Sequence, residues 1–110
     1  MEKHNINDCI KGWFIGNFPK AILKREDFEV SVKHYNAGES DDAHYHKVAT
    51  EYTVIASGTC TINGKSYFKD DIIVINPGDI AQFTAISDVI TVVVKTPSCN
   101  YNDKFMVDSA

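Results

Sequence analysis

The sequence predicts an all-β domain, an antiparallel sandwich or barrel, and three observations support this. From Phe28 onward, short runs alternate between apolar and polar residues, which is the two-residue period of half-buried strands. Turn residues separate these runs, and Asn63-Gly64 between two of them is a strong hairpin signal. No run of ten or more residues has a convincing helical period. Short strands at close spacing are typical of antiparallel sandwiches and barrels.

The strands follow in order along the chain. The first is expected over 28–35, with four alternate residues turned toward the core: Phe28, Val30, Val32 and His34. Later strands are expected where β-branched and aromatic residues cluster between turn residues, over 52–56, 60–62, 65–68, 72–75, 82–86 and 89–95. Pro97 ends the last strand, since proline cannot donate to a ladder.

The residues before this first strand have no clear period. Residues 20–27 are expected to form one short helical turn or an irregular loop. An apolar cluster precedes them, made of Trp13, Phe14, Ile15 and Phe18. A cluster of this kind needs to be buried, so we expect it either to pack along the barrel or to reach a partner subunit.

Length and composition indicate one globular domain over residues 1–110. It divides into an N-terminal arm over about 1–27, a barrel over about 28–97 and a polar C-terminal tail. Hydrophobic residues make up 44% and charged residues 24%, which excludes a disordered chain. The net charge is −4 and no basic stripe is present, so we expect no nucleic-acid partner, because such a surface needs clustered cations.

The cysteines and the N-terminus bear on the compartment. Cys9, Cys60 and Cys99 are odd in number, and no pair has the spacing of a zinc or redox site. Neither a signal peptide nor an apolar run of transmembrane length is visible, so we expect no membrane partner and a cytoplasmic location with reduced thiols. Cys60 alternates with Ile62 in a strand, and we expect it to be a small core residue rather than a catalytic thiol.

Two histidines and a glutamate form the candidate metal site. His44 and His46 are two residues apart, so on an extended strand both side chains point to the same face. Glu51 follows a short connection, and an antiparallel return can bring its carboxylate to the same point. Two imidazoles and one carboxylate are a facial ligand set that leaves coordination positions open. Taken alone, the two histidines also fit a strand with two exposed side chains.

The flanking residues extend this pattern to five positions, with five, one, four and six residues between them in turn: Gly38, His44, His46, Glu51 and Gly58. This spacing resembles the first motif of the cupin family. The resemblance covers most of the chain and implies a jelly-roll barrel, the double-stranded β-helix. It also implies that His44, His46 and Glu51 bind one divalent metal ion. Iron, manganese, nickel, zinc and cobalt all suit mixed nitrogen and oxygen donors.

The second cupin motif is present but altered. Asp71, an apolar strand and then Pro77-Gly78 resemble its usual order. The family generally places a histidine ligand where this chain has Ala81, which cannot bind a metal. The alternatives are an open three-ligand site, a weaker site, or a replacement ligand. His34 is the first candidate for a replacement and Gln82 a distant second, although a core histidine bonded to a neighbour is the simpler interpretation of His34.

Two functions remain open at this point. The first is a metalloenzyme of the dioxygenase or isomerase type that acts on a small organic acid or sugar-like substrate, with an ion that polarises a substrate oxygen or binds dioxygen. The second is a non-catalytic module that binds a sugar or an acid. The resemblance does not choose between them, because fold does not imply function.

Two further expectations concern partners. Lys95 closes an apolar run, and it is either a solvated lysine or a cation that projects into the barrel mouth toward an anionic ligand. A homodimer is expected, because a partner can protect an exposed strand edge and bury the N-terminal cluster. The resemblance supports it, since many cupins dimerise.

Overall fold

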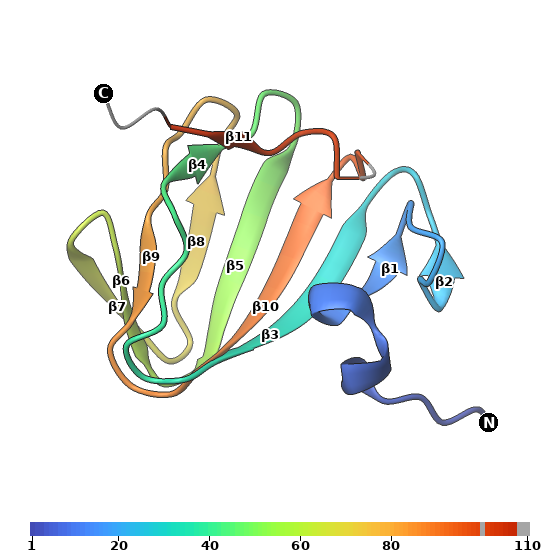
Figure 1. The fold of residues 1–110 in the computed structure, drawn as a ribbon, viewed down its shortest axis with the longest axis horizontal. Helices are drawn as coiled ribbons and strands as arrows, with labels where there is room; N and C mark the ends of the chain where they lie inside the picture. Colours follow the sequence, from blue (N-terminus) through green and yellow to red (C-terminus); the bar gives the residue numbers. More distant parts are fainter. Residues whose placement is uncertain (100, 108–110) are drawn as a thin grey trace.

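The computed structural model describes residues 1–99 and 101–107 and shows an antiparallel jelly-roll barrel, which confirms the predicted fold class. Its large sheet has six strands in the order β2-β1-β3-β10-β5-β8 (Figure 1). These strands are β1 (Trp13–Gly16), β2 (Leu23–Lys24), β3 (Glu29–Tyr35), β5 (Thr50–Ser57), β8 (Ile72–Ile75) and β10 (Val89–Thr96). The β1–β2 pair is parallel, and the other ladders of the described residues are antiparallel.

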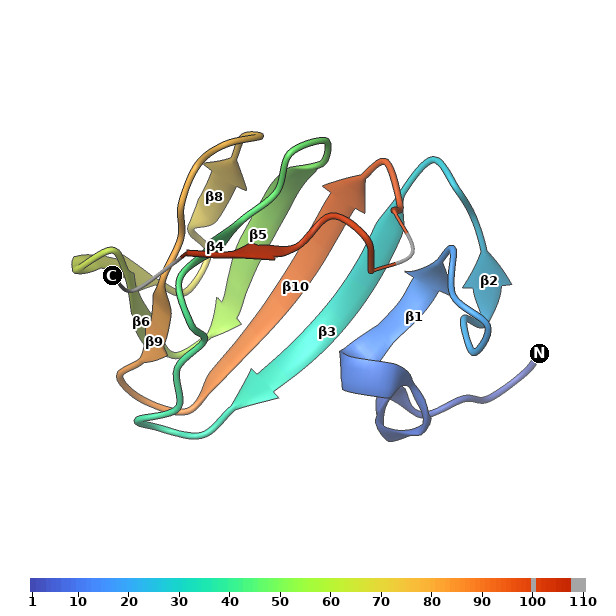
Figure 2. The ribbon, with the colours of Figure 1, turned by 45° about the horizontal axis from the view of Figure 1, so that its top comes forward.

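Two smaller sheets complete the barrel. One has the order β7-β6-β9, from β6 (Thr59–Ile62), β7 (Lys65–Phe68) and β9 (Phe83–Ala85). The other pairs β4 (His44–Tyr45) with β11 (Phe105–Met106), so the C-terminal segment returns to the barrel. In Figure 2 this pair crosses in front of β5. No helix among the described residues is long and apolar enough to cross a membrane.

The strands expected after Phe28 are present, with bounds that differ from the prediction by at most two residues. The N-terminal region differs more. Residues 20–27 form the short strand β2 and irregular turns, which is closer to the irregular loop than to the helical turn that was the other expectation. Two 3₁₀ turns lie earlier, η1 (Ile6–Asp8) and η2 (Ile10–Gly12). Gly12 has a φ of 79°, and a Cβ there would lie 1.9 Å from the Val32 carbonyl oxygen. Only glycine therefore lets this arm approach β3 so closely.

The expected orientation of β3 is wrong. Glu29 and Ser31 are its buried residues, while His34 is exposed. The ladder with β10 explains this, because Ser31 pairs with buried Val93 and Lys33 with buried Thr91. Directly paired residues lie on the same face of a sheet. The polar half of β3 therefore faces the barrel interior, and the apolar half faces outward.

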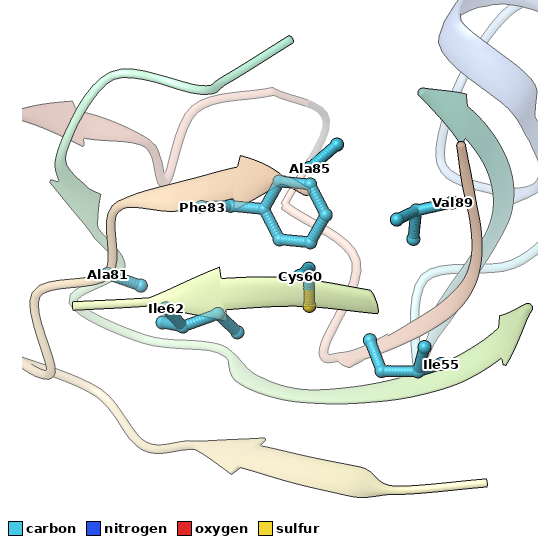
Figure 3. Close-up of a cluster of buried hydrophobic side chains, with 7 residues drawn as sticks. All are labelled: Ile55, Cys60, Ile62, Ala81, Phe83, Ala85 and Val89. Carbon is cyan, nitrogen blue, oxygen red and sulfur yellow. The ribbon is translucent and has the colours of Figure 1, made fainter. Parts of the chain in front are cut away.

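Apolar side chains form two clusters inside the barrel. The first, shown in Figure 3, consists of Ile55, Cys60, Ile62, Ala81, Phe83, Ala85 and Val89. Cys60 is fully buried there, which confirms its predicted role as a core residue. The second consists of Trp13, Phe18 and Val93, so the N-terminal aromatic residues pack along their own barrel. Burying a side chain such as Ile55 stabilises the fold by about 1.5–3 kcal/mol.

Candidate functional site

The barrel brings the three predicted ligands to one cavity. His44 begins β4, His46 follows that strand directly, and Glu51 is the second residue of β5. The imidazole centroids of His44 and His46 are 5.4 Å apart, and His46 Nε2 lies 3.5 Å from Glu51 Oε1. All three line a cavity of about 900 Å³. Glu51 is held from the other side, because the Thr53 hydroxyl donates a hydrogen bond of 2.7 Å to its Oε2.

Main-chain carbonyls fix the orientation of both imidazole rings. His46 Nδ1 donates to the Asp103 carbonyl at 2.6 Å, and His44 Nδ1 donates to the Asp42 carbonyl at 2.9 Å. A carbonyl oxygen only accepts, so Nδ1 must carry the proton in each ring. In the neutral form each Nε2 then has a free lone pair. A metal-ligating histidine typically has its other ring nitrogen held in this way.

The environment of His46 Nε2 is unusual for a buried atom. The His46 side chain is 3% exposed, and among the described residues its Nε2 has no hydrogen-bond partner. The nearest acceptor, Glu51 Oε1 at 3.5 Å, is at ion-pair distance but is too far for a good hydrogen bond. A buried polar atom without a partner is rare in native proteins and needs an explanation.

The charge states suit a cation at this point. Burial by itself raises the pKa of Glu51, but the contacts with His46 and Thr53 and the charge of Lys95 outweigh it and lower this pKa to about 2. Glu51 is therefore a carboxylate at neutral pH. Burial lowers the pKa of His44, which favours the neutral ring that binds metals.

The donors fit a divalent ion in their chemistry, but they are not yet gathered around one point. Among the described residues, no three His, Cys, Asp or Glu side chains converge closely enough to hold an ion. His46 and Glu51 form a close pair, and His44 stands beside them with its ring at an angle of 74° to that of His46.

Ala81 lies where the altered second motif places it. Its N–H and carbonyl exchange hydrogen bonds of 2.9 and 3.1 Å with His44, so the two residues are direct cross-strand partners. Such partners point to the same face, and Ala81 is buried and lines the cavity. Neither replacement candidate suits the site. His34 is on the outer face of β3, and the Gln82 side-chain amide donates to the Asp41 and Phe83 carbonyls.

Sequence reasoning missed Asp103, which holds the segment between His46 and Glu51. Its carboxylate accepts hydrogen bonds of 2.8–3.1 Å from three consecutive main-chain N–H groups, those of Lys47, Val48 and Ala49. The same residue accepts the His46 Nδ1 proton on its carbonyl. Asp103 therefore positions the loop between His46 and Glu51 through both its side chain and its backbone. No periodicity in the polar tail signals this role.

The inner faces of β3 and β10 add polar groups to the cavity. Lys33 and Lys95 line it and place their ammonium nitrogens 5.0 and 4.9 Å from the centroid of the Trp13 ring. Glu29 is also buried in this wall, and burial raises its pKa although the charge of Lys95 opposes the change. Lys95 thus projects into the barrel, the second of the two alternatives for this residue.

Comparisons with known proteins find similar folds but no similar sequences. No protein-family model matches the chain, and no curated protein matches it. A double-stranded β-helix protein from Klebsiella pneumoniae superposes with a TM-score of 0.70 at 21% identity, over 79% of this chain and 75% of that one. A cupin of the RmlC-like type from Shewanella frigidimarina superposes with a TM-score of 0.62 at 13% identity, over 68% of this chain and 70% of that one. This chain folds as a small cupin domain.

One structural neighbour of this cupin domain is described by an activity. The DMSP lyase DddQ from Ruegeria pomeroyi has a TM-score of 0.69 at 15% identity, over 86% of this chain and 49% of the lyase. The cupin domain therefore spans about half the length of that enzyme. At these identities the likeness shows the fold alone.

Proposed function

We propose that this cupin binds one divalent metal ion on His44, His46 and Glu51 and acts on a small organic acid or sugar-like molecule in the adjoining cavity. The buried His46–Glu51 pair carries the proposal. When the His46 ring is neutral, its Nε2 lone pair and the Glu51 carboxylate are both acceptors, 3.5 Å apart, and either a proton on Nε2 or a bound cation makes their contact favourable. We propose that a metal ion takes this place. Two ligands at about 2.1 Å from one ion and at right angles are about 3 Å apart, which is close to this spacing.

In this proposal the His44 side chain turns toward the His46–Glu51 pair to complete the set. Its ring is half-buried, and a turn toward the ion would exchange the single hydrogen bond that holds it, to the Asp42 carbonyl, for a bond to the metal. An ion held by these three residues supplies a Lewis acid with open positions, which polarises a carbonyl or carboxylate oxygen. Thr53 and Asp103 orient Glu51 and His46 toward it. Iron, manganese, nickel, zinc and cobalt remain the candidate ions.

An enzyme of the dioxygenase or isomerase type is the function that we favour. Phe83, which would exclude a substrate if it blocked the cavity, packs instead with Ile55 and Val89 in the first apolar cluster, leaving about 900 Å³ open. A neighbour of the same fold is named as a lyase, which shows that such a barrel supports catalysis elsewhere. The second candidate, a module that only binds a sugar or an acid, is favoured by Ala81, because the missing fourth ligand weakens metal binding.

The proposal includes a homodimer, on grounds that differ from the sequence argument. Trp13 and Phe18 are only 5% and 3% exposed within one chain, so they need no partner. The outer face of the large sheet, in contrast, needs a partner to cover it. Two rows of four apolar residues run across β3, β10, β5 and β8 in direct register: Val32, Val92, Val54 and Ile72, and Val30, Val94, Tyr52 and Val74. A contiguous apolar sheet face of this kind is typical of an interface.

The cytoplasm remains the proposed compartment. All three cysteines are free thiols, and this state persists where the medium is reducing.

Metal titration tests the proposed function. Purified protein is treated with a chelator, and the binding of iron(II), manganese, nickel, zinc and cobalt is then measured by calorimetry and elemental analysis. We expect one ion per chain for wild type and a loss of at least about tenfold in affinity for His44→Ala. His4→Ala is the matched control, because His4 is exposed at the N-terminus. His34→Ala tests the replacement ligand and should leave affinity unchanged. No binding of any of these ions by wild type would refute the proposal.

A further inference from the structure

We propose that Lys33, Lys95 and Trp13 form an anion-binding point in the cavity, which holds a carboxylate of the substrate beside the metal ligands. The inference rests on the proposed function only in treating the bound anion as part of a substrate. Lys33 is on β3 and Lys95 on β10, and both belong to the inward-facing set of their strands. Their ammonium groups approach the same indole ring, at 5.0 and 4.9 Å from its centroid.

The ammonium groups of Lys33 and Lys95 repel each other beside the Trp13 ring, and an anion bound between them would reduce this repulsion. Burial lowers the pKa of Lys33, and the nearby charge of Lys95 lowers it further. Among the described residues, neither ammonium group forms a salt bridge with a carboxylate. The indole face attracts each cation but carries no net negative charge. A bound carboxylate would reduce the repulsion between the two ammonium groups and accept hydrogen bonds from both lysines.

Hydroxyl groups on the same wall support a polar ligand. Thr91 is the direct ladder partner of Lys33, is 2% exposed and lines the cavity. Its Oγ1 is buried and has no hydrogen-bond partner among the described residues. The Oγ of fully buried Ser31, two residues from Lys33 on the same face, is in the same state. An unsatisfied buried hydroxyl is costly, so a polar ligand or ordered water has to serve it.

The acidic groups of the cavity leave room for this anion. Glu29 is the direct ladder partner of Lys95, but its carboxylate accepts from the Cys99 N–H at 3.4 Å and, among the described residues, forms no salt bridge with Lys95. Glu51 is already engaged by Thr53 and faces His46. Asp41 accepts a hydrogen bond of 3.0 Å from the Tyr35 hydroxyl, and the Asp103 carboxylate is occupied by main-chain N–H groups.

The lysine pair and the proposed metal ion together define a substrate class. One end of the molecule carries a carboxylate for the lysine pair, and the other carries an oxygen donor for the ion. Small dicarboxylic and oxo-carboxylic acids have this form, whereas a neutral sugar lacks the charge for the first position. The inference therefore narrows the proposed substrates from acids and sugars to acids with two separated oxygen groups.

Tryptophan fluorescence gives a direct assay, because Trp13 is the only tryptophan in the chain. Succinate is titrated into metal-free protein at constant ionic strength, and its uncharged diamide, succinamide, is titrated in parallel. We expect a saturable change with succinate and none with succinamide. Lys33→Gln and Lys95→Gln should each weaken succinate binding by about tenfold or more, the loss expected for one charge-assisted bond. Equilibrium dialysis with labelled succinate measures the same affinities if the fluorescence of a variant does not respond.

The matched control is Lys65→Gln, since Lys65 also stacks on an aromatic ring, Tyr67 at 5.7 Å, but is exposed and outside the cavity lining. It should bind succinate as wild type does. Lys33→Arg and Lys95→Arg keep the charge and should retain most of the affinity even if a glutamine variant folds poorly. Equal affinity in wild type and both glutamine variants, or equal loss in Lys65→Gln, would overturn the inference. The assay uses metal-free protein, so succinate binding can be confirmed even if the protein binds no metal. Likewise, metal binding can be confirmed even if the protein binds no succinate.

Discussion

Replacing Asp103 by alanine should destabilise the fold and weaken metal binding together. The substitution removes the acceptor of three main-chain N–H groups and leaves them without a partner. Lys47 and Val48 are exposed, so in the variant water can accept hydrogen bonds from their N–H groups. Ala49 is 2% exposed, so water cannot reach its N–H. A hydrogen bond to a charged acceptor contributes about 1.5–3 kcal/mol, so the total loss should be about 2–4 kcal/mol.

A loss of this size is easily measured for a small domain. Against a typical unfolding free energy of about 5–15 kcal/mol, it should lower the Tm by about 10–20 °C. Urea denaturation and calorimetry give the unfolding free energy and the Tm directly. Metal affinity should fall by about tenfold or more, because the loop that carries His46 is no longer held. Asp103→Asn keeps one acceptor oxygen and should lie between the alanine variant and wild type.

The same carboxylate predicts a dependence on pH. Burial alone raises the pKa of Asp103, but the N–H groups of Ala49, Lys47 and Val48 outweigh it and lower the pKa. Its stabilising contribution is therefore complete above the unfolded pKa of about 3.9 and is lost as the pH falls through the lower folded value. The stability difference between wild type and Asp103→Asn should shrink over that acid range.

Asp79→Ala is the control for the alanine substitution. Its carboxylate is exposed and accepts one main-chain bond of 2.9 Å, from Asn76, so its loss should cost less than about 1 kcal/mol. A change of less than about 0.5 kcal/mol in Asp103→Ala would show that the C-terminal segment is not docked on the barrel in solution. The account of how His46 is positioned would then be refuted.

Two further predictions concern the metal and the outer sheet face. Ala81→His should add a ligand directly opposite His44 and tighten metal binding by about tenfold or more; an unchanged affinity and an unchanged coordination number by X-ray absorption would show that position 81 does not face the ion. Val74→Glu, at a side chain 49% exposed on β8, should convert a dimer into a monomer in sedimentation analysis, with Lys69→Glu as an exposed control outside the two apolar rows. A wild-type chain that sediments as a monomer at micromolar concentration would refute the dimer.

The sequence allowed the positions of the strands along the chain and the hairpin to be predicted, because both depend on local signals. The Asn63-Gly64 turn and the two-residue period hold wherever one face of a strand is apolar. Gly58, the last position of the first motif, also has a physical reason in the structure: its φ is 86°, and a Cβ would lie 2.0 Å from the Asp88 carbonyl oxygen. A close approach of this kind tolerates only glycine.

The parts that could not be predicted depend on contacts between distant segments. On β3 the rule that turns apolar residues inward failed, because Glu29 and Lys33 line the cavity and Ser31 is buried between them. Val30 and Val32 lie on the other face of the strand. Departures from local rules are expected at functional sites. The role of Asp103 depends on the return of the tail to β4, which no pattern in the tail itself indicates.

One face of the large sheet lines the cavity and the other carries the apolar rows, and this determines where the two cavities of a dimer would lie. On β10, Thr91, Val93 and Lys95 line the cavity. Val92 and Val94, which alternate with them, belong to the outer apolar rows. Two chains joined through those rows would stand back to back, with their cavities opening in opposite directions. Each cavity would then fill and empty without a passage through the interface, and neither copy would complete the ligand set of the other. Separated chains should therefore keep their affinity for metal and for anions.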